Sequence, residues 1–170
     1  MGEEIYYADA AELAEKIRSK ALSPVDVVQA HLERIEEVNP KLNAVVALVD
    51  GAMERAREAE EALARGESWG PLHGVPFTIK DCLDTRGIRT TRGSLLFEDH
   101  VPAADATAVT RMKQAGGIML GKTNMPEFAL WWETDNRVFG RTENPWKEGR
   151  TPGGSSGGEA AAIASGMSPL

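Results

Sequence analysis

The sequence predicts an α/β fold in which helices pack against a small sheet of buried strands. Amphipathic helical patterns alternate along the chain with short, apolar, β-branched segments, which is typical of a layered α/β domain. A length of 170 residues suits one domain with a sizeable core. The content of 42% hydrophobic and 26% charged residues is ordinary for a soluble globular protein.

Residues 1–66 are predicted to form a helical opening to this domain. Asp9, with Glu12 three residues later, matches the capping box of a first helix. The pair at 23–24, Ser-Pro, predicts the start of a second helix. That helix is expected to stop before the pair Asn39-Pro40, because a residue that precedes proline disfavours helical geometry. No residue of this opening is predicted to carry chemistry.

A strand and a third helix are predicted to complete the opening. Residues 42–49 are apolar and β-branched, which favours a strand or an extended segment. Asp50 is predicted to cap the third helix. Gly66 is predicted to end it, since glycine readily adopts the left-handed conformation that follows a helix.

Residues 67–170 are predicted to contain the chemically active part of the chain. The segment 77–80, Phe-Thr-Ile-Lys, is a predicted buried strand that ends on Lys80. Two interpretations of this lysine are open. Its amine either reaches solvent or pairs with Asp81, or it is buried and serves as a base.

A helix and a second buried strand are predicted next. Asp105 is predicted to cap a helix over 106–115, and residues 118–120 form the strand. A short helix over 126–131 is then expected, with Asn124 as its cap.

The glycine- and serine-rich segment 150–159 organises the end of the chain. It runs directly into an alanine-rich segment, which predicts a helix over 159–165 that Gly166 ends. Its two adjacent serines therefore lie near a helix N-terminus, where free N–H groups favour negative charge. A flexible linker is the alternative interpretation, but a linker does not lead straight into an apolar helix.

Composition excludes several classes of protein. A net charge of −7 without a run of Lys or Arg argues against a nucleic-acid partner, and no apolar stretch has the length of a transmembrane helix. The first four residues, Met-Gly-Glu-Glu, lack the features of a signal peptide. Cys82 is the single cysteine, so an internal disulfide is excluded and a cytoplasmic location is expected. We interpret it as a small hydrophobic residue rather than a nucleophile.

Two familiar motifs occur in the sequence but lack the structural context that they need. Residues 116–123 match the phosphate-loop pattern, but a predicted helix precedes the first glycine and a predicted strand occupies the loop positions. Residues 153–157 match the nucleophile elbow of α/β-hydrolases. No apolar strand precedes that serine, and all three histidines lie before Ser155 instead of after it. Neither nucleotide binding nor a Ser-His-Asp enzyme is therefore predicted.

A third set of motifs is specific, because it consists of four blocks in a fixed order. The blocks are 70–81 (Gly-Pro-Leu-His-Gly-Val-Pro-Phe-Thr-Ile-Lys-Asp), 121–129 (Gly-Lys-Thr-Asn-Met-Pro-Glu-Phe-Ala), 140–146 (Gly-Arg-Thr-Glu-Asn-Pro-Trp) and 151–159 (Thr-Pro-Gly-Gly-Ser-Ser-Gly-Gly-Glu). Together they resemble the amidase signature family of Ser-Ser-Lys hydrolases over essentially the whole chain.

The resemblance implies the fold and the extent of the domain. It implies the N-terminal portion of the amidase-signature α/β/α fold, with a central mixed sheet flanked by helices. In this interpretation residues 1–170 belong to one amidase domain. Residues 1–66 are its helical opening, residues 67–170 are part of its catalytic core, and the C-terminal remainder is absent from the sequence.

The resemblance also implies roles for particular residues in amide hydrolysis. Lys80 is the general base, and Ser155 relays the proton and follows a cis peptide bond. Ala129, Leu130 and Trp131, together with Ser155, are expected to bind the substrate. A lysine base must be neutral, and moving its pKa from about 10.4 toward 7–8 requires roughly 3–4 kcal/mol of differential destabilisation. No metal or cofactor is expected.

The sequence departs from the family pattern in one decisive respect. The nucleophilic serine of the family, and the turn that forms its oxyanion hole, lie further along the chain than residue 170. The expectation is therefore that this chain contains the base and the relay but not the nucleophile, and that it is inactive by itself. A small-molecule amide is the expected substrate. No nucleic-acid or membrane partner is expected, and a homodimer or a complementing C-terminal chain are the alternatives for assembly.

Three functions remain open within this interpretation. A stand-alone amidase is favoured over the A subunit of a glutamyl-tRNA amidotransferase. That subunit usually has an acid where Pro126 stands, small polar residues where Trp131 and Trp132 stand, and a serine where Glu159 stands. The tryptophans suggest a bulky apolar wall near an acyl pocket, although a role in the core is an equally good interpretation for at least one of them. A non-catalytic fragment or binding module is the third alternative.

Overall fold

The computed structural model describes residues 5–170 of the chain. In order, its elements are α2 (Ala10–Arg18), α3 (Pro24–Leu42), β1 (Val45–Leu48), α4 (Ala52–Ala64), β2 (Pro76–Lys80), the 3-10 helix η1 (Leu95–Phe97), α5 (Thr107–Gln114), β3 (Ile118–Thr123), the 3-10 helix η2 (Glu127–Ala129) and α6 (Gly157–Ala164). The first four residues, on which the interpretation about a signal peptide rests, lie outside the described residues. In residues 5–170, no helix combines the length and the apolar character that crossing a membrane requires.

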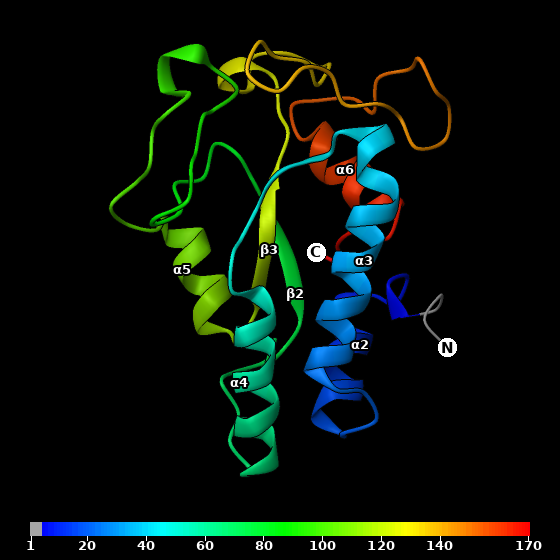
Figure 1. Cartoon of the computed structure of the whole chain (residues 1–170), viewed down its shortest axis with the longest axis vertical. Helices are drawn as coiled ribbons and strands as arrows, with labels where there is room; N and C mark the ends of the chain where they lie inside the picture. Colours follow the sequence, from blue (N-terminus) through cyan, green and yellow to red (C-terminus); the bar gives the residue numbers. More distant parts are fainter. Residues whose placement is uncertain (1–4) are drawn as a thin grey trace.

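The sheet is mixed, as the resemblance implies. Its strand order is β1-β3-β2, with β1 antiparallel and β2 parallel to β3. Figure 1 shows β2 and β3 at the centre, with α5 on one side, α2, α3 and α6 on the other, and long loops gathered at the top. The predicted α/β fold is confirmed, and β2 and β3 both point their C-terminal ends toward the loops.

Two faces of the sheet have different coverings. The larger core cluster joins apolar residues of α3, α4 and α6 to Ile118 and Leu120 of β3. On the opposite face, Val109 of α5 packs with Phe77, Ile79 and Met119. The alternation of side chains along β2 and β3 thus divides the strands between two apolar layers.

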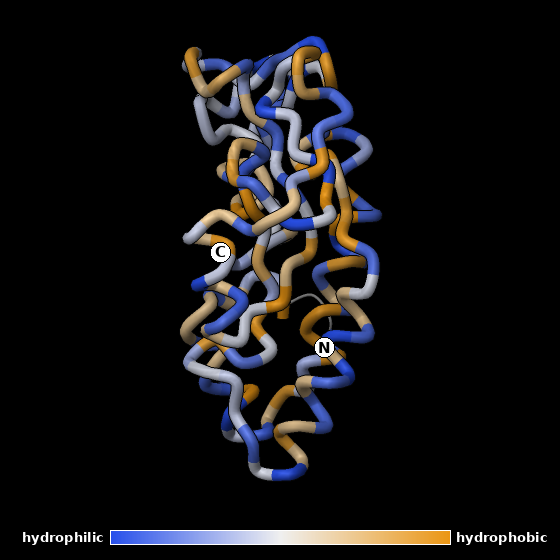
Figure 2. Tube along the Cα trace, turned by 90° about the vertical axis from the view of Figure 1, so that its left-hand side faces the viewer, coloured by the Kyte–Doolittle hydropathy of each residue, from blue (hydrophilic) through white to orange (hydrophobic). Residues whose placement is uncertain are grey.

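The loop-rich end of the molecule also displays apolar side chains. Figure 2 shows hydrophobic segments among hydrophilic ones at this end, at the top of the view. Leu96, Leu130, Trp132 and Trp146 are each more than three-quarters exposed.

The first two helices begin as predicted, but the second does not end as predicted. Asp9 Oδ1 accepts a hydrogen bond from Glu12 N, and Ser23 Oγ accepts one from Val25 N. Pro40, expected to follow the second helix, lies inside α3. Near the end of this helix, Asn39 Oδ1 accepts hydrogen bonds from Ala44 N and Val45 N, which join the helix to the start of β1.

Two predicted caps are wrong. Asp50 does not cap α4, which begins after Gly51 without a side-chain cap. Asp105 does not cap α5, since its carboxylate is used elsewhere: it accepts a hydrogen bond from Arg86 N and pairs with Lys113 at 2.8 Å. A neighbouring cation and a neighbouring loop amide compete with the helix for the same carboxylate.

The remaining boundaries shift by a few residues. β1 is shorter than the predicted 42–49, and β3 extends past residue 120 to Thr123. The short helix over 126–131 is a 3-10 turn of three residues, with Pro126 instead of Asn124 at its N-cap. The last helix starts at Gly157, two residues before the predicted start, and Gly166 follows it with φ +77°.

Candidate active site

The centre of the candidate site is the amine of Lys80, at the last residue of β2. Its Nζ lies 2.7 Å from Ser155 Oγ and 2.9 Å from Ser156 Oγ. The structure thus brings Lys80 and Ser155 together from opposite ends of the region 67–170. Lys80 is half-buried, and this burial lowers the pKa of its amine below the ordinary value. A lower pKa favours the neutral amine, which is the form that can accept a proton.

The serine pair lies between an irregular loop and α6. The Gly154–Ser155 peptide bond is cis, as the resemblance implies. Ser156 is the residue that precedes the first turn of α6. Lys80 therefore meets two hydroxyls at a helix N-terminus, at the carboxyl ends of parallel strands, where ligand sites of α/β sheets commonly lie.

Thr134 fixes this loop, a role that no pattern in the sequence predicts. Its Oγ1 donates a hydrogen bond to Gly153 O and accepts one from Gly157 N. A Cβ on Gly157 would lie 2.2 Å from the same oxygen, so only glycine permits the contact. Residue 134 lies in a polar segment outside the helices and strands, and no local pattern marks its contact with a helix 23 residues later.

Glu159 is a second residue whose contacts the sequence did not predict. Its carboxylate accepts hydrogen bonds from Thr78 Oγ1 on β2 and Thr123 Oγ1 on β3. Burial raises the pKa of this carboxyl, and the two hydroxyl donors act in the opposite direction.

A shallow pocket of about 370 Å³ opens beside Ser155. Its lining contains all four residues expected to bind substrate, Trp132, which was expected with Trp131 in an apolar wall near an acyl pocket, and Gly154, which was not expected there. The full lining is Ala129, Leu130, Trp131, Trp132, Gly154 and Ser155. Leu130 and both tryptophans are exposed in this chain, so they provide an apolar wall rather than a filled core. The alternative role in the core therefore does not apply to either tryptophan within this chain.

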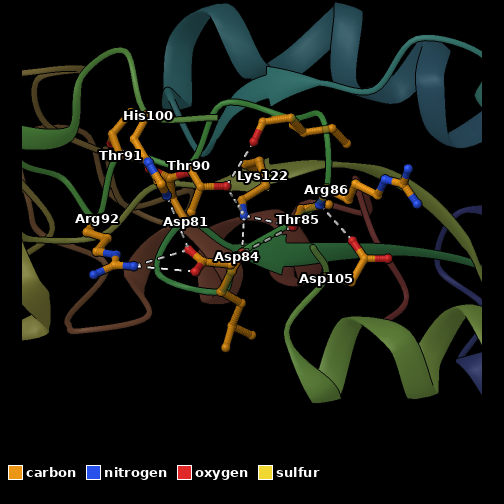
Figure 3. Close-up of polar contacts among 12 residues, drawn as sticks. Asp81, Asp84, Thr85, Arg86, Thr90, Thr91, Arg92, His100, Asp105 and Lys122 are labelled. Carbon is orange, nitrogen blue, oxygen red and sulfur yellow. Dashed lines mark hydrogen bonds and ion pairs between the residues drawn. The ribbon is translucent and has the colours of Figure 1, made fainter. Parts of the chain in front are cut away.

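A buried polar cluster lies near the C-terminal ends of β2 and β3, on the face of the sheet opposite to Lys80, as Figure 3 shows. Lys122 Nζ donates hydrogen bonds to Leu83 O, Thr85 Oγ1 and Thr90 Oγ1. Its side chain is fully buried, and burial lowers the pKa of the amine to about 8. Lys122 belongs to the rejected phosphate-loop motif, and it lies within β3, beyond the predicted end of that strand at residue 120, with its amine turned into the protein.

Asp81 belongs to this cluster and not to Lys80. Its Oδ2 accepts hydrogen bonds from Thr91 N at 3.0 Å and Thr91 Oγ1 at 2.6 Å, as Figure 3 shows. Burial raises the pKa of its carboxyl. Because successive residues of an extended chain point to opposite faces, Lys80 turns toward α6 and Asp81 away from it. Cys82, which follows, is only partly buried.

Known proteins resemble this chain in both sequence and structure. The sequence profile of the Amidase family matches residues 26–170. The A subunit of the glutamyl-tRNA(Gln) amidotransferase of Carboxydothermus hydrogenoformans is 49% identical over 164 residues, which are 96% of this chain and 34% of that protein. The corresponding protein of Cutibacterium acnes is 47% identical over 169 residues, with 98% and 34% covered. The chain spans about a third of the length of these relatives.

Solved structures give the same result. A bacterial aryl acylamidase of the amidase signature family superimposes with a TM-score of 0.91 at 36% identity, over 97% of this chain and 35% of that one. The peptide amidase from Stenotrophomonas maltophilia does so with a TM-score of 0.88 at 33% identity, over 95% and 34%. The profile match covers most of the chain, and the helices, mixed sheet and serine loop have the arrangement that the motifs imply. The chain therefore belongs to the amidase signature family.

Proposed function

We propose that this chain supplies the general base and the proton relay for amide hydrolysis in a longer protein. Lys80 is the base and Ser155 is the relay. The observation that carries the proposal is the distance of 2.7 Å between Lys80 Nζ and Ser155 Oγ, at an amine whose pKa is lowered by burial. Residues 1–66 serve as the helical opening of the domain, and residues 67–170 as part of its catalytic core.

The proton path follows from this geometry. Neutral Lys80 takes the proton of Ser155, while Ser155 takes the proton of a nucleophilic hydroxyl supplied from beyond residue 170. That oxygen adds to the amide carbonyl, and the same path returns a proton to the leaving nitrogen as the C–N bond breaks. A serine hydroxyl is a weak nucleophile until a base removes its proton, which is why the neutral amine matters.

The pocket beside Ser155 indicates what kind of amide fits. Leu130, Trp131 and Trp132 present apolar surface next to the relay hydroxyl. We assign this pocket to the acyl or aryl group of a small-molecule amide. Because the chain has one cysteine and an ordinary charge balance, we place the protein in the cytoplasm.

A second function is supported by the sequence relatives. The amidotransferase A subunits named above are 47–49% identical to this chain, whereas the two amidases of solved structure are 33–36% identical. This function would require partner subunits, whereas a stand-alone amidase would not. The apolar pair Trp131 and Trp132 favours the amidase, because small polar residues are usual at these positions in the amidotransferase.

The proposal is tested by replacing the base in the full-length protein. We expect Lys80→Ala to lower turnover of a panel of aryl and alkyl amides by several orders of magnitude. The far-ultraviolet circular dichroism should stay unchanged, because the amine is at the edge of the core. The control is Lys113→Ala, which removes an amine from α5, outside the site. Near-normal turnover by Lys80→Ala at neutral pH would contradict the proposal. Glutamine-dependent amidation only with added subunits would favour the second function.

A further inference from the structure

Glu159 carries a partly buried carboxylate that the proton path above does not use. Thr78 Oγ1 donates to one of its oxygens at 2.5 Å, and Thr123 Oγ1 donates to the other at 2.9 Å. Both threonines are buried, so these hydrogen bonds form away from solvent. Three elements meet at this carboxylate: α6, β2 and β3.

The positions of these residues relate the carboxylate to the proposed site. Thr78 precedes Lys80 by two residues, so both side chains lie on the same face of β2. Thr123 is the direct neighbour of Lys80 across the parallel pair of strands. Glu159 lies four residues after Ser155, in the first turn of α6. Two hydrogen bonds therefore connect the strand end that carries Lys80 to the helix start that carries the serine pair.

The apolar contacts of α6 determine its position less closely than the hydrogen bonds of Glu159 do. Its core-facing residues, Ala161 and Ala162, are small and have no rotamers that interlock with a neighbour. Gly158 allows close approach to Asn124 but offers no side chain. Hydrogen bonds from Gly157 N to Thr134 Oγ1 and from Gly158 N to Asn124 O hold the first residues of α6. The hydrogen bonds that Glu159 accepts from Thr78 and Thr123 add directional contacts to β2 and β3, the strands next to Lys80.

An ionised carboxylate also suits this place in the helix. A negative charge in the first turn interacts favourably with the N-terminal end of the helix dipole. Burial without partners would disfavour the charge, and the two hydroxyl donors counteract this. The group is thus held as an acceptor of two hydrogen bonds, one from each strand.

We propose that Glu159 is a positioning residue, which sets the separation between Lys80 and Ser155 by tying α6 to β2 and β3. The inference rests on the proposed function, since it concerns the geometry of that base and relay. A misplacement of about 1 Å in such a site lowers the rate by roughly 10²-fold, so even a small shift of α6 is measurable.

The test uses the full-length protein, with the rate of labelling by a fluorophosphonate probe measured from pH 5 to 10. Glu159→Ala removes both acceptors, and Glu159→Gln keeps the length and one acceptor oxygen. We expect about a 10²-fold lower labelling rate for the alanine variant and a smaller loss for glutamine. Glu58→Ala is the matched control, because it removes a carboxylate from the exposed face of α4.

The pH profile separates positioning from mere loss of stability. When α6 loosens, water reaches the amine of Lys80, its pKa rises, and the acid limb of the profile moves to higher pH. Cys82 is the other titratable group that acts on Lys80, so all variants are compared in a Cys82→Ser background. The variants Thr78→Val and Thr123→Val, each alone and combined with Glu159→Ala, should show effects that are not additive.

The outcomes are distinct. A Glu159→Ala protein with the wild-type labelling rate, or with a lower rate but an unshifted acid limb, would overturn the inference. If this variant does not fold, the labelling rate and the acid limb are measured for Thr78→Val and Thr123→Val, and a wild-type rate or an unshifted acid limb in both overturns the inference. Failure of the proposed function appears differently: the wild type is not labelled, or Lys80→Ala is labelled as fast as the wild type.

Discussion

Lys80 and Lys122 lie on adjacent strands and point to opposite faces of the sheet. The first is half-buried beside two serine hydroxyls, and the second is fully buried among backbone and threonine oxygens. Burial lowers the pKa of both amines, because the charged form loses its hydration. Only Lys80 has hydroxyls of the serine pair as its neighbours, so only Lys80 is proposed as the base, although burial perturbs both amines.

The buried amine of Lys122 predicts a pH dependence of stability. Its pKa falls from an ordinary value of 10.5 to about 8 in the folded protein. Between these values the unfolded state binds more protons, so stability rises with pH across this window and is lower below it. The shift corresponds to on the order of 3 kcal/mol.

Urea titrations of the full-length protein and of Lys122→Met measure this dependence. We expect the unfolding free energy of the lysine protein, relative to the methionine variant, to increase between pH 7 and 10. A Cys82→Ser background removes the thiol that acts electrostatically on Lys122. If the difference in unfolding free energy between the two proteins stays constant or decreases with pH, burial does not disfavour the charged form of the Lys122 amine.

At the scale of single residues, the sequence predicts the site only in part. The motifs were sufficient to predict that Lys80 lies beside Ser155 and that Ala129, Leu130 and Trp131 lie near Ser155, while the roles of these residues stay proposals. The contacts of Thr134 and Glu159 could not be predicted, because each depends on how α6 docks on elements far away in the sequence. Local patterns contain no information about such docking.

At the scale of elements, the docking of α6 depends on glycine. A Cβ on Gly158 would lie 2.4 Å from the backbone nitrogen and oxygen of Asn124, which cannot move independently of β3. Helix propensity alone predicts that alanine stabilises this position by about 1 kcal/mol. The clash with backbone atoms is the larger effect, so the substitution Gly158→Ala is expected to destabilise the protein.

A pair of substitutions in the same helix tests this account. We expect Gly158→Ala to lower the thermal unfolding midpoint by more than Ala160→Gly does. Residue 160 is exposed, so its change reports helix propensity alone. The measurement is differential scanning calorimetry of the full-length protein. A higher midpoint for Gly158→Ala would mean that α6 does not approach Asn124 as closely as described.

The boundaries of elements were the least predictable feature. Pro40 is expected by local rules to follow a helix, yet α3 continues to Leu42, and Asn39 Oδ1 accepts hydrogen bonds from Ala44 N and Val45 N. Asp105 is a good cap by local rules, yet Lys113 and a loop amide take its carboxylate. At Asp105 these partners outweigh an N-cap preference of about 1 kcal/mol.

At the scale of the whole molecule, the chain is about one third of the length of its relatives. Trp132 and Trp146 are largely exposed at the loop-rich end. At β2, Thr78 N donates hydrogen bonds to Ser168 Oγ and Leu170 O, so residues 168 and 170 lie against this strand.

Residues 1–170 by themselves are expected not to hydrolyse amides. A base and a relay without a nucleophile cannot form an acyl-enzyme, and removal of a nucleophile typically lowers the rate by several orders of magnitude. The check is to purify residues 1–170 and assay aryl and alkyl amides together with a fluorophosphonate probe. Clear turnover with covalent labelling of a serine in this chain would place the nucleophile within residues 1–170.

The most direct test of the central claim is the protonation state of Lys80 itself. Lysine labelled with carbon-13 at the ε position reports the pKa of each amine by NMR titration of the full-length protein. The variants Lys80→Arg and Lys122→Arg assign the two perturbed signals. We predict that the Lys80 signal titrates below 10.5, and that its midpoint equals that of the acid limb of probe labelling. A Lys80 pKa at or above 10.5 would contradict the account, because the base would then be protonated at the pH of the reaction.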